Sequence, residues 1–147
     1  MKLILIVEDE YGHAEILQLL LIAEGYRVAS ASNGKAALEL LQDEPPSLIL
    51  SDFMMPIMNG GELGEAVRRS SSLCNIPFVI MSGTDEDIVR RTFGDYDAFL
   101  VKPFDGQAML ALVERLIANG RPAQPSKEEV SESMRQLLKG IRLSDGE

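Results

Sequence analysis

The sequence predicts a doubly wound α/β domain, in which five β–α units in order, written (βα)₅, form a parallel five-stranded sheet with helices on both faces. Two observations carry this prediction. Short apolar runs alternate along residues 1–120 with segments in which apolar residues recur at helical spacing. Most of these runs are almost continuously apolar, as expected of strands that are buried on both faces of a parallel sheet.

The five apolar runs are the predicted strands. They cover residues 3–7, 26–30, 48–51, 78–81 and 98–101. Four of them are nearly uninterrupted in apolar residues. The second alternates polar and apolar residues more than the others, which indicates a strand at an edge of the sheet.

The first three predicted helices have recognisable ends. The first spans about residues 10–24 and stops before Gly25, a residue suited to the position after a helix. The second is stopped by Pro45 and Pro46. The third covers about residues 60–69.

The last two predicted helices complete the pattern. The fourth is expected to begin at Thr84, with Asp87 three residues later in a loose capping box. The fifth carries an apolar stripe over residues 109–117 and is closed by Gly120.

A C-terminal helical extension is predicted beyond this domain. The expected division is a domain at 1–120, a linker at 121–125, a helix at 126–142 and a tail at 143–147. The helix residues with coiled-coil spacing are Val130, Met134, Leu137 and Ile141. They cover less than two heptads, so packing on the domain or on a partner is an equal alternative to a coiled coil.

Composition and charge exclude several classes of function. The chain has 147 residues, enough for one domain with a core, and no apolar run approaches the ~18 residues of a membrane span. A net charge of −9 argues against direct binding to nucleic acid, because phosphate binding needs clustered Lys and Arg. The single Cys74 and the absence of a signal peptide pattern lead us to expect a cytoplasmic protein.

Polar side chains follow four of the predicted strands. They are Glu8 and Asp9 after the first strand, Asp52 after the third, Ser82 after the fourth and Lys102 after the fifth. In an open α/β sheet, ligands bind outside the carboxyl ends of the strands. If the first and third strands are neighbours, the three carboxylates converge and repel one another unless a cation is present.

This set of residues indicates phosphoryl chemistry. Mg²⁺ prefers oxygen ligands, usually one or two carboxylates with waters and phosphate oxygens. A metal, the Lys102 ammonium and the Ser82 hydroxyl around one carboxylate can neutralise and position a transferring phosphoryl group. The Asp52 carboxylate can then act as the nucleophile and form an aspartyl phosphate.

Four motifs carry a family resemblance: "ILIVEDE", "LILSDFMMPIMNG", "FVIMSG" and "FLVKPF". Their order and spacing over residues 1–120 resemble the CheY-like receiver domain of response regulators in two-component signal transduction. The resemblance implies a flavodoxin-like fold with strand order 2-1-3-4-5. It also implies that Asp52 accepts a phosphoryl group from a phosphohistidine of a sensor histidine kinase or phosphotransfer protein.

The resemblance assigns further roles. The metal, Mg²⁺ or Mn²⁺, would be held by Glu8, Asp9, Asp52 and the backbone carbonyl of Met54. Ser82 and Lys102 would bind the phosphoryl oxygens, and Ser82 would be coupled to the aromatic switch residue Phe99. Three residues depart from the commonest pattern, because Glu8 replaces Asp, Ser82 replaces Thr and Phe99 lacks a tyrosine hydroxyl.

The implied output is contact with a downstream protein target. The face formed by the fourth helix, fifth strand and fifth helix would change shape on phosphorylation. A homodimer through that face or through the C-terminal helix is an open alternative. The resemblance implies no membrane contact and no enzyme with an external substrate, since such a domain catalyses only its own phosphorylation and dephosphorylation.

Each site residue taken alone also fits a purely structural role, and other functions use similar folds. Asp9 and Ser82 could each cap a helix, and Asp52 could form an Asx turn. Lys102 could be a solvated lysine on the surface. An aspartyl-phosphate hydrolase needs a carboxylate two residues after its nucleophile, where this chain has Met54. A flavodoxin-like cofactor binder needs a polar phosphate loop after the first strand, where this chain is acidic. The module could also belong to a larger hybrid kinase or multidomain regulator.

Overall fold

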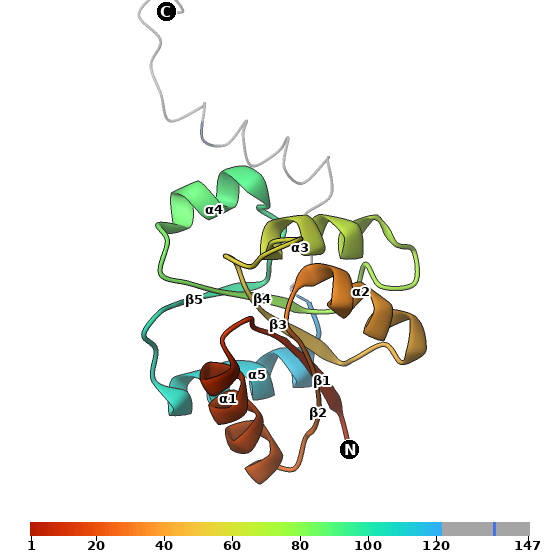
Figure 1. Cartoon of the computed structure of the whole chain (residues 1–147), viewed down its shortest axis with the longest axis vertical. Coiled ribbons are helices and arrows are strands. Elements are labelled where there is room, and N and C mark those ends of the chain that lie inside the picture. The colour runs from red at the N-terminus through yellow and green to blue at the C-terminus, as the bar shows by residue number, and fades with distance from the viewer. Residues whose placement is uncertain (122–136, 138–147) are drawn as a thin grey trace, which may run out of the picture.

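The computed structural model describes residues 1–121 and residue 137 of the chain. Its centre is a parallel sheet with strand order β2-β1-β3-β4-β5, and helices cover both faces (Figure 1). This confirms the predicted fold class and strand order. Apart from residues 121 and 137, the predicted linker 121–125, helix 126–142 and tail 143–147 lie outside the described residues.

Five β–α units follow one another along the chain. The strands are β1 (Leu3–Val7), β2 (Arg27–Ala31), β3 (Leu48–Asp52), β4 (Phe78–Ser82) and β5 (Ala98–Val101). The helices are α1 (Tyr11–Ala23), α2 (Gly34–Asp43), α3 (Gly60–Arg69), α4 (Glu86–Thr92) and α5 (Gly106–Asn119). The strand β2 lies at an edge, as its alternating sequence predicted.

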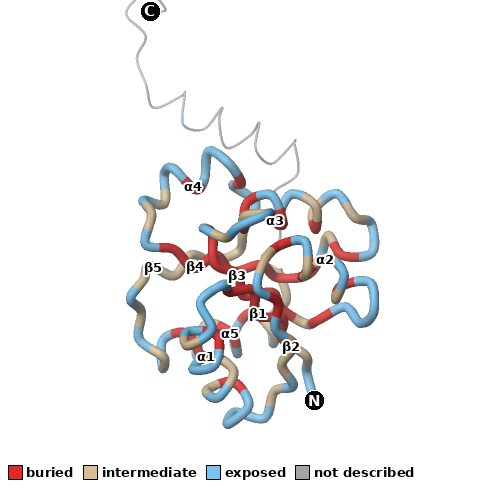
Figure 2. Tube along the Cα trace, viewed as in Figure 1, coloured by how far each residue is buried: buried red, intermediate tan, exposed pale blue. Residues whose placement is uncertain are grey.

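The sheet separates two apolar layers. Side chains of α1 and α5 pack on one face, and those of α2, α3 and α4 pack on the other (Figure 1). All residues of β3 and β4 are buried, which Figure 2 shows as the centre of the molecule. Continuous burial on both faces explains why β3 begins with the apolar run LIL and β4 with the apolar run FVIM.

The start of α4 differs from the prediction. The expected capping box between Thr84 and Asp87 is wrong, because the helix begins at Glu86 with Asp85 as its N-cap. The Asp85 carboxylate accepts from the Asp87 N–H at 2.9 Å, while the Thr84 N–H donates to Ser82 Oγ at 2.9 Å. The N–H groups of Thr84 and Asp87, which the expected capping box would have paired, therefore donate to Ser82 and Asp85 instead.

A polar network closes the amino ends of β4 and β5. Arg68 donates to the carbonyls of Cys74 (3.1 Å) and Ile76 (2.7 Å) and to Asp97 Oδ2 (2.9 Å). Arg121 donates to the other oxygen of the same carboxylate, Asp97 Oδ1, at 2.9 Å. The Asp97 side chain is only 1% exposed, and the two arginines supply the positive charge that its buried carboxylate needs.

None of the helices among residues 1–121 combines the length and the apolar character needed to cross a bilayer.

Candidate functional site

Three carboxylates meet at the carboxyl end of the sheet. The strands β1 and β3 are neighbours, with Val7 paired to Ser51, so the residues that follow them lie side by side. One carboxylate oxygen each of Glu8, Asp9 and Asp52 lies within 4.8 Å of the others. The first and third strands are therefore neighbours, and the three carboxylates converge as the sequence predicted.

The three carboxylates differ in exposure. Glu8 and Asp52 are buried, with exposed fractions of 3% and 8%, whereas Asp9 is exposed. The N-cap of α1 is Glu10, whose carboxylate accepts from the N–H groups of Gly12 and His13. Asp9 therefore does not cap α1.

One lysine bridges the two buried carboxylates. Lys102 Nζ donates to Glu8 Oε1 at 2.9 Å and lies 3.2 Å from Asp52 Oδ2. Its side chain is only 25% exposed, which excludes a freely solvated surface lysine. The residue follows β5, two strands away from β3, so the sheet order brings the cation to the acidic edge.

The backbone around Asp52 fixes the direction of its carboxylate. Asp52 Oδ1 accepts from the Phe53 N–H at 2.9 Å, and the Ser51 hydroxyl donates to the Asp52 carbonyl at 2.8 Å. The following loop returns closely, since a Cβ on Gly60 would lie 2.3 Å from the Asp52 carbonyl oxygen. Only glycine fits at position 60. Because the Phe53 N–H holds Oδ1 of Asp52, the other carboxylate oxygen, Oδ2, faces Lys102.

The other predicted residues lie around this centre. Ser82 ends β4, is 1% exposed and has its hydroxyl oxygen bonded by the Thr84 N–H. Met54 follows Asp52 by two residues, and its side chain is exposed. Phe99 is partly buried on β5, where it packs with the α2–α4 layer. Its strand partner is Ile80, while Ser82 pairs with Val101.

A scan against family models matches residues 4–114 to the response regulator receiver domain. The chain belongs to this family. The match covers all of the sheet except Leu3 and includes every predicted site residue of the receiver domain.

Curated relatives of this receiver domain include regulators of transcription. The probable transcriptional regulator ycf29 of Pyropia yezoensis is 33% identical over 147 residues, which is 98% of this chain and 66% of that protein. The alkaline phosphatase synthesis transcriptional regulatory protein PhoP of Bacillus subtilis is 31% identical over 90% of this chain and 55% of its own length. The chain thus spans about half to two thirds of these relatives.

Solved structures share the fold. The signal receiver domain of a signal transduction histidine kinase from Syntrophus aciditrophicus has a TM-score of 0.76 at 30% identity, covering 86% of this chain and 98% of that one. The response regulator TrrA of Thermotoga maritima, in complex with Mg²⁺ and BeF, has a TM-score of 0.69 at 27% identity, with coverage of 79% and 99%.

The electrostatics of the receiver domain follow from burial and from the lysine. Burial raises the pKa of Asp52 to about 6, the neighbouring Glu8 carboxylate adds to this rise, and Lys102 opposes it. Burial also acts to raise the pKa of Glu8, but Lys102, the Asp52 side chain and the Glu10 N–H together outweigh burial and hold that pKa below its usual range. At neutral pH one ammonium therefore faces two buried carboxylates.

This charge imbalance fits a hard cation. Three carboxylate oxygens close to one another, with one lysine to neutralise them, leave negative charge at the site. Oxygen donors in this arrangement suit Mg²⁺ better than softer metals, which favour Cys or His. The residues that the structure brings together therefore could hold the metal that the sequence predicts.

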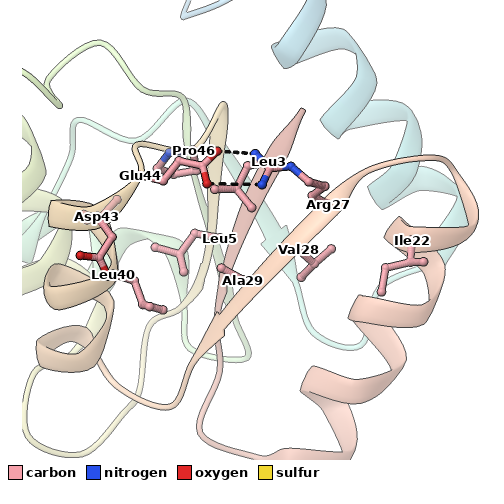
Figure 3. Close-up of a pocket in the computed structure, with 11 residues that line it drawn as sticks. Leu3, Leu5, Ile22, Arg27, Val28, Ala29, Leu40, Asp43, Glu44 and Pro46 are labelled. Carbon is pink, nitrogen blue, oxygen red and sulfur yellow. Dashed lines mark hydrogen bonds and ion pairs between the residues drawn. The ribbon is translucent and has the colours of Figure 1, made fainter. Parts of the chain in front are cut away.

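Two hollows flank the sheet. One of about 380 Å³ lies beside the acidic edge and is bordered by Glu8, Lys102 and α1 residues. The other, of about 500 Å³, lies at the β2 edge, where Arg27 and Glu44 pair across it (Figure 3). Its walls are mainly aliphatic and it lies away from the carboxyl end of β3, so we assign it no role in phosphoryl chemistry.

Some residues near the site escaped the sequence analysis. The side chain of His13 is 61% exposed, and its Nδ1 lies 3.8 Å from Glu8 Oε1 and 3.2 Å from Glu10 Oε2. Ile57 adopts a φ of 71°, which a β-branched residue rarely does. Asn59 forms a capping box with Glu62 at the start of α3.

Proposed function

We propose that this receiver domain is a phospho-accepting switch in which Asp52 takes a phosphoryl group from a phosphohistidine of a sensor histidine kinase or phosphotransfer protein. One observation carries the proposal. Lys102 Nζ lies 3.2 Å from Asp52 Oδ2 and 2.9 Å from Glu8 Oε1, at the acidic carboxyl end of β3. A buried nucleophilic carboxylate with a fixed cation beside it suits phosphoryl transfer.

In the proposed step an Asp52 carboxylate oxygen forms a bond to phosphorus while the phosphorus–nitrogen bond of the phosphohistidine breaks. The bonding pair returns to the imidazole nitrogen, which then takes up a proton. Lys102 neutralises phosphoryl oxygen charge and the Ser82 hydroxyl donates to a phosphoryl oxygen. Only the ionised carboxylate is nucleophilic, so protonation of Asp52, whose pKa burial raises in the metal-free site, opposes transfer.

The proposed cofactor is Mg²⁺ or Mn²⁺. Glu8, Asp9 and Asp52 would hold it with their carboxylates, and Met54 with its backbone carbonyl. When bound, the metal would supply positive charge that offsets the negative charge of the phosphoryl oxygens. The single ammonium of Lys102 offsets only part of that negative charge.

The proposed readout runs from Ser82 to Phe99. A phosphoryl group on Asp52 offers new charge-assisted bonds to the Ser82 hydroxyl, which biases the end of β4 toward it. Rotation of the Phe99 ring would then alter the surface formed by α4, β5 and α5. A downstream protein would recognise this surface, and a homodimer through it, or through the C-terminal helix 126–142, is the alternative readout.

The domain is proposed to act on itself alone. Its reactions would be its own phosphorylation and dephosphorylation, since Met54 offers no carboxyl group to act as the general acid of a hydrolase. We propose a cytoplasmic location and contact with proteins. Direct contact with nucleic acid is disfavoured, because residues 1–120 carry the whole net charge of −9. Names of relatives such as transcriptional regulator support a role within a larger regulatory protein.

Incubation with acetyl phosphate and Mg²⁺, followed by intact mass measurement, tests the proposal. We expect the wild type to gain one phosphoryl group and Asp52→Asn to gain none. The exposed Asp43→Asn is the matched control and should behave as the wild type. No gain in the wild type, or equal gain in Asp52→Asn, would refute the assignment of Asp52.

A further inference from the structure

A hydrogen-bonded triad ties the start of α4 to the loop that precedes β5. The Tyr96 hydroxyl donates to Glu86 Oε2. Arg90 Nη2 donates to the same carboxylate oxygen at 3.0 Å, and Arg90 Nε donates to the Tyr96 hydroxyl oxygen at 3.3 Å. Glu86 is the first residue of α4 and Tyr96 lies beyond its last residue, so the triad joins the beginning of the helix to the segment after its end.

The ring of the same tyrosine packs on the proposed switch residue. The ring centroids of Tyr96 and Phe99 are 5.8 Å apart, and those of Tyr96 and Phe93 are 6.4 Å apart. Phe93 in turn makes an edge contact with Phe78 of β4 at 5.4 Å. Tyr96 therefore contacts Phe99 through its ring and α4 through its hydroxyl.

The helix α4 has few other attachments. It has only seven residues, and Val89 is the one that is buried. Phe93, directly after the helix, packs against α3 so closely that a Cβ on Gly64 would lie 2.3 Å from its ring. These two apolar contacts hold the middle and end of α4, which leaves the first turn to the Asp85 cap and the triad. A short element with few buried contacts opens easily.

We propose that Tyr96 is a positioning residue that couples the orientation of Phe99 to the position of α4. This inference rests on the proposed function, in which Phe99 rotates when Asp52 is phosphorylated. Because the Tyr96 ring packs on Phe99, rotation of Phe99 displaces Tyr96 and draws its hydroxyl from Glu86. The first turn of α4 is then released, so the triad acts as a latch on the resting form.

The chemistry of the triad suits such a latch. Burial and the bond to Glu86 raise the pKa of Tyr96, so its hydroxyl keeps the donated proton throughout the physiological range. The acceptor is an ionisable carboxylate that also pairs with Arg90. Hydrogen bonds to charged groups are stronger than neutral ones, which lets a single hydroxyl bias a short helix.

Hydrogen exchange in the metal-free, unphosphorylated protein tests the latch. The Val89 and Phe93 amides, which donate within the helix and at its end, report on the opening of α4. In Tyr96→Phe we expect them to exchange about tenfold faster, while amides of α1 and α5 stay unchanged. Tyr26→Phe, which removes a hydroxyl at the opposite edge of the sheet, is the matched control and should leave α4 exchange unaltered.

Two further variants separate the latch from a general loss of packing. Glu86→Ala should raise α4 exchange at least as much as Tyr96→Phe does, because it removes the bond from Tyr96 and also the ion pair with Arg90. The double variant should raise it no further than the larger single effect, because both changes remove one shared bond. Unaltered α4 exchange in Tyr96→Phe, or strictly additive effects in the double variant, would overturn the latch.

Titration with beryllofluoride in the presence of Mg²⁺ tests coupling to the switch. Since the latch opposes the switched form, Tyr96→Phe should reach half-saturation at a severalfold lower beryllofluoride concentration than the wild type. Equal half-saturation would refute the coupling. Failure of the proposed function is distinguishable, because it would appear as a wild type that gains no phosphoryl group from acetyl phosphate, whereas the exchange measurements need no phosphate.

Discussion

The substitution Asp52→Asn is expected to stabilise the metal-free domain. Burial and the Glu8 carboxylate raise the pKa of Asp52 from 3.8 to about 6. At pH 7.5 the ionised carboxylate is therefore less favoured in the folded chain than in the unfolded chain. At about 1.4 kcal/mol for each pKa unit, removing this charge should increase the free energy of unfolding by about 2–3 kcal/mol.

The gain should depend on pH in a defined direction. Because the folded form of Asp52 has the higher pKa, the native state binds more protons than the unfolded state between about pH 4 and pH 6. The stability that protonation gives the wild type is present below pH 4 and is lost as pH rises through 6. The difference between the wild type and Asp52→Asn should thus be small at pH 4 and complete above pH 6.

Urea denaturation in EDTA at pH 4.5 and pH 7.5 measures this difference. The exposed Asp43→Asn serves as the control and should change the free energy of unfolding by less than about 0.5 kcal/mol at either pH. Saturating Mg²⁺ should narrow the gap, since it binds the folded wild type better than the variant. An Asp52→Asn domain that is less stable than the wild type at pH 7.5 would show that the electrostatic reasoning is wrong.

Three further predictions concern residues around the site and the core. Ile57→Gly should stabilise the domain by about 1 kcal/mol in urea denaturation, because Ile57 is exposed and adopts a φ of 71°; a loss of stability would contradict the strain. Arg68→Ala should cost about 3 kcal/mol in the same assay, since it leaves the buried Asp97 with Arg121 alone; a cost below about 1 kcal/mol would show that Arg121 suffices. Asp9→Asn should weaken Mg²⁺ binding about tenfold in titration calorimetry, because one of three converging carboxylates is lost; an unchanged affinity would remove Asp9 from the proposed ligands.

The fold was predictable because its signals are local. Continuous apolar runs mark β3 and β4, and Gly25, Pro45 and Pro46 mark where helices stop. An error arose where several polar side chains stand close together in the sequence before a helix. At the start of α4, Asp85 and Ser82 both accept backbone N–H groups, so residue types alone do not decide which of them caps the helix.

The site was predictable only in part. Its members stand at strand ends, so the strand order of the sheet was enough to bring Glu8, Asp52 and Lys102 together. Contacts that depend on side-chain direction were not predictable. Tyr96 reaches Glu86 across ten residues, and Arg68 reaches Asp97 across 29, with no periodic pattern to link them.

The side chain of Arg121 anchors the carboxyl end of α5. Its guanidinium is bonded to Asp97, to Asp95 and to the Cys74 carbonyl, so the backbone leaves α5 from a point fixed to the loops before β4 and β5. Asp95 directly precedes Tyr96 in the chain. A shift in that loop would therefore move the Arg121 side chain and the carboxyl end of α5 to which it is joined.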